Sequence, residues 1–470
     1  MKFNNAFITL IIASLFAPFL APNYANAQNE AGISKTEIFL GATFPQTGPL
    51  SPYFQDFFIG AQAYFDYLNS KGGIQGRKIR LITRDDKGLA TIAVTQGSAL
   101  ILADKVFALF NSAPFVAGHV PMLRSIAIDR RKVPNLAVTA SFSGLTESSK
   151  YQTTFQAKPN AKQDIKVLTH FIEQSFSSTP INVSYPDDDI GRDFEQVMTS
   201  SSRKYSKVGS SMLGCGGIPF AQKDFGVLSL WGWFCGERQG AQKPVLVTSD
   251  SFPLIVLGSS ISSSSGAYIV ASSKSNNVYA NFSLPLYTDT QDPFIQFFTQ
   301  VFKEFAPNRD YSLEIQINDG SKSAFNYVSQ QMYEGANAAY VISQAIAALG
   351  PEPTRASLIA FLRSNSKSLS SATFSPIDYS LSSNIGDTVQ YIARYDGSKW
   401  VKVSDYYLVN ASGTSIKVTA PQRSSLLPGG LPVATVTEKS LVKIKCVKGK
   451  VTKQVTGRNP KCPTGYKKLN

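Results

Sequence analysis

Apolar residues follow two different spacings between residues 38 and 88. The run Ile38–Phe44 is short and almost wholly apolar, which predicts a buried strand, and the proline and glycine residues of Pro45–Pro49 end it. Within Phe54–Leu68 apolar residues recur at steps of three and four, the spacing of one helix face. The run Lys78–Asp86 predicts a second strand. A right-handed crossover sets these two strands parallel in one sheet.

The same pattern repeats downstream and predicts a mostly parallel sheet flanked by helices. Its further elements are a helix at Thr91–Leu102, a strand at Val106–Ser112, a loop at Ala113–Pro121, a helix ending near Arg131, and a strand at Val133–Ser141. A second sheet is predicted by a helix at Ala161–Phe176, strands at Ile181–Tyr185, Val245–Asp250 and Ala267–Val270, and a helix from Arg192. The chain is expected to cross between the two sheets near Phe155–Lys158.

The last third of the chain predicts three helices followed by a hairpin. Two helices, at Pro293–Phe305 and Phe325–Leu349, are expected to pack back on the first lobe, and Pro353–Ser364 predicts a short amphipathic helix. The hairpin is Val389–Tyr407, with Asp396 and Gly397 at its turn. Residues 411–438 are rich in Ser, Thr and Pro, which is typical of a linker.

Four short motifs in the first unit resemble a known family. They are TGPL at Thr47–Leu50, the pair Gly60-Ala61, NSKGGIQGRKI at Asn69–Ile79, and RDD at Arg84–Asp86. In this order and spacing, the chain resembles the type I periplasmic binding proteins of the leucine/isoleucine/valine-binding kind, the solute receptors of ABC importers. The resemblance covers residues 33–410 and implies a two-lobed α/β fold. Each lobe is then a mostly parallel sheet flanked by helices, and a hinge joins the lobes.

The resemblance also divides the chain. Lobe 1 is expected to comprise residues 28–157 and 278–373, and lobe 2 residues 158–277 and 374–410. Residues 200–243 do not fit, because relatives have a strand, a helix and a further strand there, and this chain offers no convincing buried strand. A real divergence, a deletion of one βα unit and a frame error in the coding sequence all remain open.

A ligand site is implied at the carboxyl ends of the strands, where helix amino termini attract anions. By resemblance, a ligand carboxylate is held by backbone groups of Thr139 and Ala140 and by the Ser141 hydroxyl. Gly118 and His119 are the candidates from the neighbouring loop. A helix N-cap is the alternative role for Ser141, and the two roles are compatible.

The remaining candidates concern the rest of the ligand. Tyr53 matches an aromatic residue that lines the side-chain pocket in relatives, with core packing as the alternative. Asp250 occupies the position of a carboxylate that holds a ligand ammonium, with an N-cap role as the alternative. Ile190 and Phe54 depart from the family by making the pocket more apolar or tighter, so the family's usual amino acid is not assumed.

The amino terminus has the pattern of a secretory signal peptide. Met1 and Lys2 precede an apolar run at Phe7–Ala21, and the small-residue pattern Ala25-Asn26-Ala27 predicts cleavage after residue 27. A membrane anchor is the alternative, although the run falls short of the roughly twenty residues that a span needs. We therefore expect an exported, extracytoplasmic protein, in the periplasm or at the cell surface.

Cysteines in an exported chain favour disulfides over zinc sites. Cys446 and Cys462 flank a short loop and are the preferred pair, and Cys215 and Cys235 could form the other. The two remaining pairings stay open.

Positive charge gathers at the carboxyl terminus. Residues 439–470 contain ten Lys or Arg and no Asp or Glu, so most of the +14 net charge lies in this tail. Its only aromatic residue is Tyr466, which argues against nucleic acid as a partner. Attraction to an anionic cell wall or membrane surface and a merely solvated terminus are the two interpretations.

The sequence gives little support to an enzyme. Its two histidines, His119 and His170, are assigned to different lobes, and no hydrolase, phosphate-loop or zinc-protease motif occurs. The acidic run Asp187–Asp189 is interpreted as a solvated turn rather than a metal site. We expect no cofactor and no metal. The leading hypothesis is a solute-binding protein that delivers an amino-acid-like ligand to an ABC permease. A ligand sensor of the same fold and a surface protein with a degenerate pocket are the alternatives.

Overall fold

The computed structural model describes residues 30–48, 51–140, 142–185, 189–199, 201, 203–209, 226–229, 254–258, 277–307, 313–316, 322–325, 329–379, 383–396, 399–432, 442–449, 451–457 and 462–468. The expected signal peptide, residues 1–27, lies outside these ranges, as do Cys215, Cys235 and the expected strands at Val245–Asp250 and Ala267–Val270. No helix in the described part of the chain is long and apolar enough to cross a membrane.

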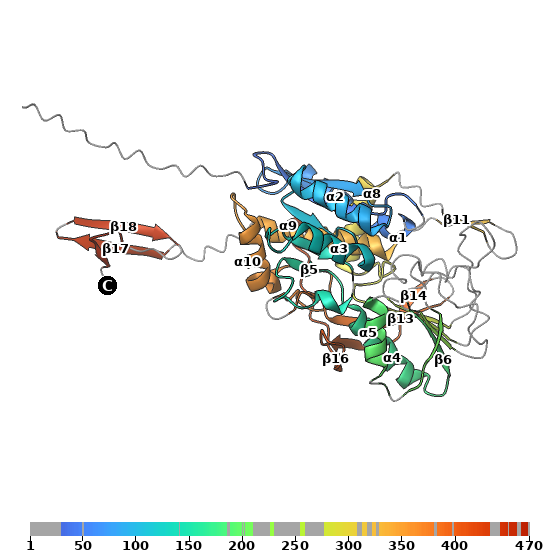
Figure 1. The fold of residues 1–470 in the computed structure, drawn as a ribbon. Helices are drawn as coiled ribbons and strands as arrows, with labels where there is room; N and C mark the ends of the chain where they lie inside the picture. The colour runs from blue at the N-terminus through green and yellow to red at the C-terminus, as the bar shows by residue number, and fades with distance from the viewer. Residues whose placement is uncertain are drawn as a thin grey trace, which may run out of the picture.

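The first lobe is built on a five-stranded parallel sheet (Figure 1). Its order is β2-β1-β3-β4-β5, with strands β1 (Glu37–Phe44), β2 (Lys78–Asp85), β3 (Ala108–Phe110), β4 (Asn135–Val138) and β5 (Thr154–Gln156). The chain moves from β1 to β2 in one direction and then back past β1 to β3. Right-handed crossovers therefore place α1 (Ser51–Ser70) on one face and α2 (Ala90–Leu102) on the other, beside α3 (Val116–Ile126).

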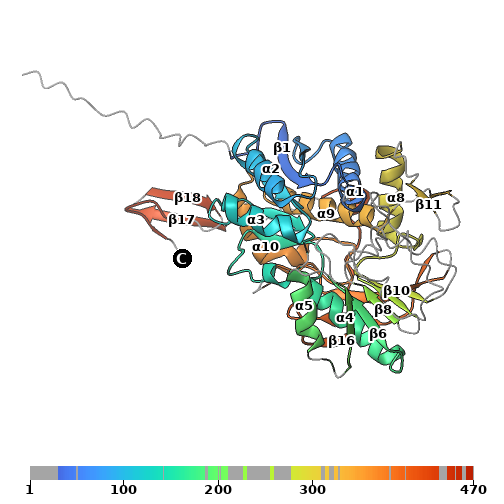
Figure 2. The same ribbon diagram turned by 45° about the vertical axis from the view of Figure 1, so that its right-hand side comes forward.

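Three later helices complete the first lobe: α8 (Pro293–Phe305), α9 (Gln330–Ala347) and α10 (Arg355–Asn365). Helix α9 packs along α1 (Figure 2), and the two backbones approach closely at two glycines. A Cβ atom on Gly60 would lie 2.0 Å from the Met332 carbonyl oxygen, and one on Gly335 would lie 1.8 Å from the Phe57 carbonyl oxygen. Gly60, found first as part of a sequence motif, is thus required by a helix crossing.

The second lobe contains a nine-stranded mixed sheet. Its main order is β16-β15-β13-β10-β9-β8-β6-β7, and β14 pairs with β13. These strands are β6 (Ile181–Ser184), β7 (Ser206–Gly209), β8 (Gly226–Ser229), β9 (Ile255–Leu257), β10 (Val278–Phe282), β13 (Val389–Tyr395), β14 (Trp400–Lys402), β15 (Tyr406–Val409) and β16 (Ile416–Thr419). Helices α4 (Ala161–Ser175) and α5 (Asp189–Met198) belong to this lobe. A capping box of Asn160 and Gln163 begins α4.

Several expected boundaries are wrong. β8 lies inside residues 200–243, where no buried strand was expected, and it pairs with β6 and β9 in the middle of the sheet. β10 belongs to the second sheet, although residues from 278 onward were assigned to lobe 1. Helix α3 begins at Val116 with Pro121 inside it, so the loop before it is shorter than 113–121. The expected start of α9 at Phe325 belongs instead to β12, which pairs with β11 (β11, Leu313–Gln316; β12, Lys322–Phe325).

The expected linker at 411–438 is wrong for its described part. Residues Ile416–Thr419 form β16, which pairs with β15. Residues 420–432, here called the strap, pack on helices of the first lobe. The hydroxyl of Tyr64 donates to the Gly430 carbonyl (2.9 Å), and the Leu427 N–H donates to the Tyr340 hydroxyl (3.1 Å). Composition suggested a linker because Ser, Thr and Pro are poor core residues, but here backbone groups make the contacts.

The strap is also anchored by charge. Arg423 pairs with Asp292, whose carboxylate caps the first N–H groups of α8, and the Asp292 side chain is 2% exposed. The guanidinium of Arg423 lies over the rings of Phe294 and Phe374, at 5.5 and 5.2 Å from their centroids. Residues 420–432 are therefore part of the folded lobe.

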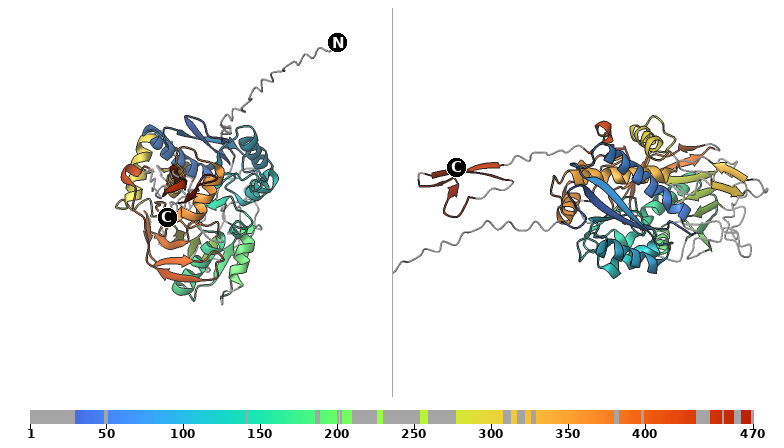
Figure 3. Two further views of the ribbon diagram at one scale, coloured as in Figure 1. Left: turned by 90° about the vertical axis from the view of Figure 1, so that its left-hand side faces the viewer. Right: turned by 90° about the horizontal axis from the view of Figure 1, so that it is seen from above.

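A three-stranded antiparallel sheet ends the described chain (Figure 3). It consists of β17 (Val442–Lys448), β18 (Val451–Gly457) and β19 (Lys467–Lys468). A disulfide joins Cys446 and Cys462, the pair that the spacing favoured.

Candidate functional site

The carboxyl ends of β1, β3 and β4 form one rim of the first sheet, because the three strands are parallel. The rim begins with the loop after β1. The carboxylate of Asp85, at the end of β2, accepts from the N–H of Gln46 (2.9 Å) and from the hydroxyl of Thr47 (2.5 Å). Burial acts to raise the pKa of Asp85, but these hydrogen bonds and that from Lys87 outweigh it and lower the pKa. A charged Asp85 thus holds the TGPL loop against β2.

The loop after β3 is fixed to β1 by a buried serine. The Ser112 hydroxyl accepts the Thr43 N–H (3.0 Å), and the Ala113 N–H donates to the Thr43 carbonyl (2.7 Å). Asn111 and Ala113 both have left-handed backbones, with φ of 47° and 48°. For alanine this conformation costs on the order of 1 kcal/mol or more, so the surrounding bonds must hold it. The loop is therefore strained and fixed in one shape.

Asn111 connects this loop to the next one. Its side-chain oxygen accepts both the N–H of Thr139 (3.0 Å) and the hydroxyl of Thr139 (2.9 Å). The Thr139 N–H that the resemblance assigned to a ligand is thus bonded to protein, while the Thr139 side chain remains half-buried. Ala140 is buried, and its carbonyl accepts from the Gln156 amide (3.3 Å). Ser141 lies outside the described residues.

The two candidates from α3 have structural surroundings. His119 is fully buried, with Nδ1 2.9 Å from the Ser112 carbonyl oxygen and Nε2 3.3 Å from the Asn135 amide nitrogen. Two carbonyls beside Nδ1 require that this nitrogen carries the proton and donates. Burial lowers the pKa of His119 to about 4, so the ring is neutral at neutral pH. From its buried position, the His119 ring thus donates a hydrogen bond to carbonyl groups of the 111–113 loop.

Gly118 is needed for packing. A Cβ atom at this position would lie 2.3 Å from the Phe115 ring, which folds over the first turn of α3. The same arrangement occurs after β4, where a Cβ on Gly144 would lie 2.3 Å from the Phe142 ring. Phe54, in the first turn of α1, lies 6.4 Å from Phe115 between ring centroids. A buried phenylalanine thus lies near the end of each of the three strands, on α1 after β1 and in the loops after β3 and β4.

A carboxylate of the second lobe contacts the segment that follows the β4 rim. Asp193, on α5, accepts from the N–H of Ser143 (2.6 Å) and from its hydroxyl (2.5 Å), and Lys162 lies 3.7 Å away. Ser143 begins the short 3-10 helix η1 (Ser143–Leu145) that follows the β4 rim. Burial raises the pKa of Asp193, although Ser143 and Lys162 act to lower it. This bonding joins the two lobes beside the expected site.

Two further candidate ligand residues, Tyr53 and Asp250, have side chains outside the described part of the structure. Tyr53 lies in the first turn of α1, at the rim, but its side chain is outside the described residues, as is the whole of Asp250. Asp187 and Asp188 of the acidic run are outside them too. Within the described ranges no cluster of three or more His, Cys, Asp or Glu could hold a metal ion.

Sequence reasoning missed three residues that organise the rim: Asp85, Asn111 and Asp193. Asp85 belongs to the RDD motif, and its place at a strand end was the available signal. Asn111 lies near the end of the predicted strand Val106–Ser112, and a polar residue at that place was the available signal. Nothing in the sequence indicated that Asp193 would contact Ser143, because the two residues come from different lobes.

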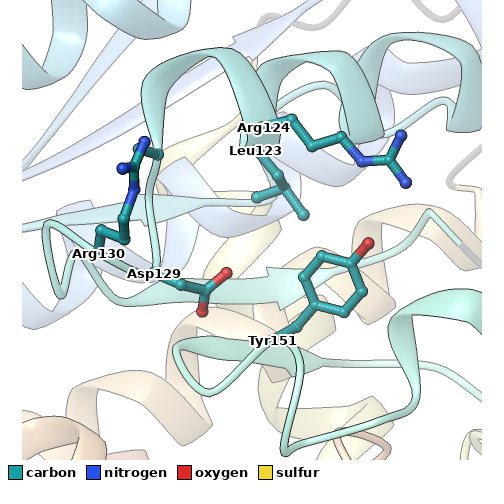
Figure 4. A pocket seen from close by; sticks show the side chains of 6 residues that line it. Leu123, Arg124, Asp129, Arg130 and Tyr151 are labelled. Atoms are coloured by element: carbon teal, nitrogen blue, oxygen red, sulfur yellow. The ribbon is translucent and has the colours of Figure 1, made fainter.

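A surface hollow of about 230 Å³ lies at the opposite edge of the first sheet (Figure 4). It is lined by Leu123, Arg124, Ala127, Asp129, Arg130 and Tyr151. Figure 4 shows Arg124 and Arg130 pointing away from each other, and Asp129 accepts the N–H and hydroxyl of Thr153 (3.0 and 2.9 Å). The arginines do not converge on a ligand position, so the hollow is separate from the rim.

The two-lobed α/β fold described above is also found in known proteins. Residues 37–229 match the family model described as periplasmic binding protein. The chain is similar to a branched-chain amino acid ABC transporter protein from Thermus thermophilus with bound valine (TM-score 0.61, 13% identity, covering 81% of this chain and 98% of that one). It is also similar to an ABC transporter solute-binding protein from R. palustris in complex with benzoate (TM-score 0.58, 14% identity, covering 78% and 96%).

The architecture is therefore the α/β fold of type I periplasmic binding proteins, as the sequence predicted. The chain is also similar in sequence to a Leu/Ile/Val-binding protein homolog. It is 22% identical over 193 residues to Leu/Ile/Val-binding protein homolog 7 of Brucella abortus (strain 2308), a match that covers 41% of this chain and 45% of that protein. The chain thus matches less than half the length of this curated relative.

Proposed function

We propose that this chain is an extracytoplasmic solute-binding protein. It captures an amino acid or a similar small polar ligand between its lobes and delivers it to the permease of an ABC importer. The observation that carries the proposal is the fixed rim of the first sheet: three loops at one sheet edge, held in shape by Asp85, Ser112 and Asn111. Such preorganisation reduces the ordering cost of binding.

The proposed mechanism is closure of two lobes around the ligand. The chain passes between the lobes four times, after β5, after β10, before β13 and after β16, where the strap returns to the first lobe. A ligand that contacts both lobes stabilises the closed form by its differential affinity, and this form docks on the permease. Ser141 is proposed to bind the ligand carboxylate and Asp250 its ammonium. Tyr53 is proposed to line the side-chain pocket.

The phenylalanines near the rim leave two classes of ligand to be distinguished by experiment. Phe54, Phe115 and Phe142 favour a ligand with an apolar body, and the structural neighbours include proteins with valine and with benzoate bound. An apolar carboxylate without an ammonium group is therefore the second candidate ligand. The two classes differ in their need for Asp250.

The test is a thermal-shift panel of amino acids, amides and short carboxylates, benzoate included, on the exported chain. A ligand at 100 times its Kd stabilises by about 2.7 kcal/mol, enough for a rise in Tm of several degrees. Asp250→Ala should abolish stabilisation by zwitterions and spare carboxylates, and the exposed Asp405→Ala is the matched control. If no ligand class raises Tm, the chain is a surface protein with a degenerate pocket. Neighbouring permease and ATPase genes would separate an importer from a sensor.

A further inference from the structure

The small carboxyl-terminal sheet carries a concentrated positive charge that ligand binding in the lobes does not explain. Residues 439–470, here called the tail module, contain ten Lys or Arg and no Asp or Glu. Cys446 in its central strand β17 is fully buried, and its disulfide to Cys462 ties β17 to the segment that leads into β19. The described part of the tail module is thus a cross-linked sheet, and five of its lysines are exposed.

The strand register distributes these cations over both faces of the sheet. Cys446 pairs with Lys453 on one side and with Lys468 on the other, and residues opposite each other in antiparallel strands share a face. Lys448, two residues along β17, lies on this same face. Lys467 pairs with Val447 and therefore lies on the opposite face, together with Lys445. All five lysines are exposed.

Among the tail-module residues whose exposure the structure describes, Val451 is the large apolar side chain that is exposed, and Val447 and Tyr466 are half-buried. Val451 is 53% exposed, and Tyr466 is half-buried with the Lys453 ammonium 5.4 Å from its ring centroid. A bilayer is flat and can contact one face of such a sheet, and stable attachment to it needs apolar insertion besides charge. A flexible linear polymer can follow both faces at once.

We propose that the tail module binds a linear polyanion of the cell envelope, a polymer with repeating phosphate or carboxylate groups, and so retains the receptor at the cell wall. Binding is driven by release of counterions from the polymer, as for other cationic proteins on polyelectrolytes. This inference does not depend on which ligand the lobes bind.

The experiment measures binding of the full exported chain to polyphosphate and to polyglutamate at several salt concentrations. With about five cations engaged, affinity should fall on the order of 100-fold between 50 and 200 mM salt. Lys445→Ala with Lys467→Ala tests one face, and Lys448→Ala with Lys453→Ala and Lys468→Ala tests the other. Each set should weaken binding at least tenfold. The control replaces five exposed lysines outside the tail module, namely Lys35, Lys71, Lys78, Lys399 and Lys417, and should change affinity less than twofold.

Three results would overturn the proposal. The control set weakening binding as much as the tail sets would show a non-specific charge effect. Tighter binding to phosphatidylglycerol vesicles than to either polymer, with one face alone responsible, would identify a membrane as the partner. Preference for single-stranded DNA would identify nucleic acid. Thiol titration of each variant shows whether the disulfide is intact, so a loss of binding can be separated from loss of the sheet.

Discussion

The carboxylate of Asp193 in lobe 2 accepts two hydrogen bonds from Ser143 in lobe 1, at 2.6 and 2.5 Å. The two residues are 50 positions apart in sequence, and they meet where the β4 rim faces helix α5. Because the acceptor is largely buried, losing its donors is costly. This contact couples the orientation of the lobes to the rim that we propose holds the ligand.

Asp193→Asn should weaken this contact, because an amide offers one acceptor where the carboxylate offers two. We expect unfolding free energy to fall by about 1–3 kcal/mol. A double-mutant cycle of Ser143→Ala and Asp193→Ala, followed by chemical denaturation, should give a coupling energy of about 1 kcal/mol or more. Ser143→Thr, which keeps the hydroxyl, is the control. Additive effects of the two alanine substitutions would contradict the proposed coupling.

Gly335→Ala should destabilise the first lobe strongly. The new methyl group would meet the Phe57 carbonyl oxygen at 1.8 Å, so the α1 and α9 backbones would have to separate. Overpacking against movable side chains costs about 1–3 kcal/mol, and a backbone contact should exceed this range. Gly97→Ala on α2 is the graded control, since its nearest atoms belong to the Met122 and Ile126 side chains. Equal losses of Tm in the two variants would argue against a close backbone crossing.

Truncation separates the strap from the tail module. A chain ending at Pro432 should keep the Tm of the full chain, because every described strap contact is retained. A chain ending at Ala420 removes the partners of Tyr64, Tyr340 and Asp292. Loss of one partner of a buried ion pair costs about 3–5 kcal/mol, so this chain should melt at a clearly lower temperature. Calorimetry of the two truncated chains is the measurement, and identical Tm values would support a linker after all.

The buried carboxyl groups of Asp387 and Asp86 should each make stability fall as pH rises from about 4 to 7, whereas His119, whose pKa burial lowers to about 4, acts in the opposite direction below about pH 6.5. Burial raises the pKa of Asp387 from 3.8 to about 7, and burial likewise raises the pKa of Asp86 to about 6. The folded state then binds protons that the unfolded state releases, so unfolding free energy decreases with pH in this window, by at most about 1.4 kcal/mol per pH unit for each group. Asp387 accepts from Ser375 (3.4 Å) and the Val389 N–H (3.2 Å) at the crossing between lobes.

Asp387→Asn should remove the Asp387 contribution, so the decrease in unfolding free energy with pH should become smaller between pH 6 and 7, while Asp86 keeps its own contribution. Denaturant midpoints measured at each half pH unit check this. The exposed Asp405→Asn should leave the slope as it is. A slope unchanged by Asp387→Asn would mean that another group binds the proton.

Local pattern predicted most elements of the first lobe. The apolar runs that became β1, β2 and β4 and the three-and-four spacing of α1 were read from neighbouring residues, because burial of one face imposes a period on the sequence. The Cys446–Cys462 disulfide was also favoured by local spacing. By contrast, β8 is four residues long and lies in an atypical segment, so its period was too short to recognise.

The sequence by itself determined that the chain forms alternating strands and helices, and that most of its net positive charge lies in residues 439–470. Tertiary structure alone decided what those elements touch. It buried His119 beneath the 111–113 loop, used Asn111 to bond Thr139, and turned an expected linker into the strap. The physical reason is that periodicity records which side of an element is buried, whereas a hydrogen-bond partner in another element leaves no trace in local spacing.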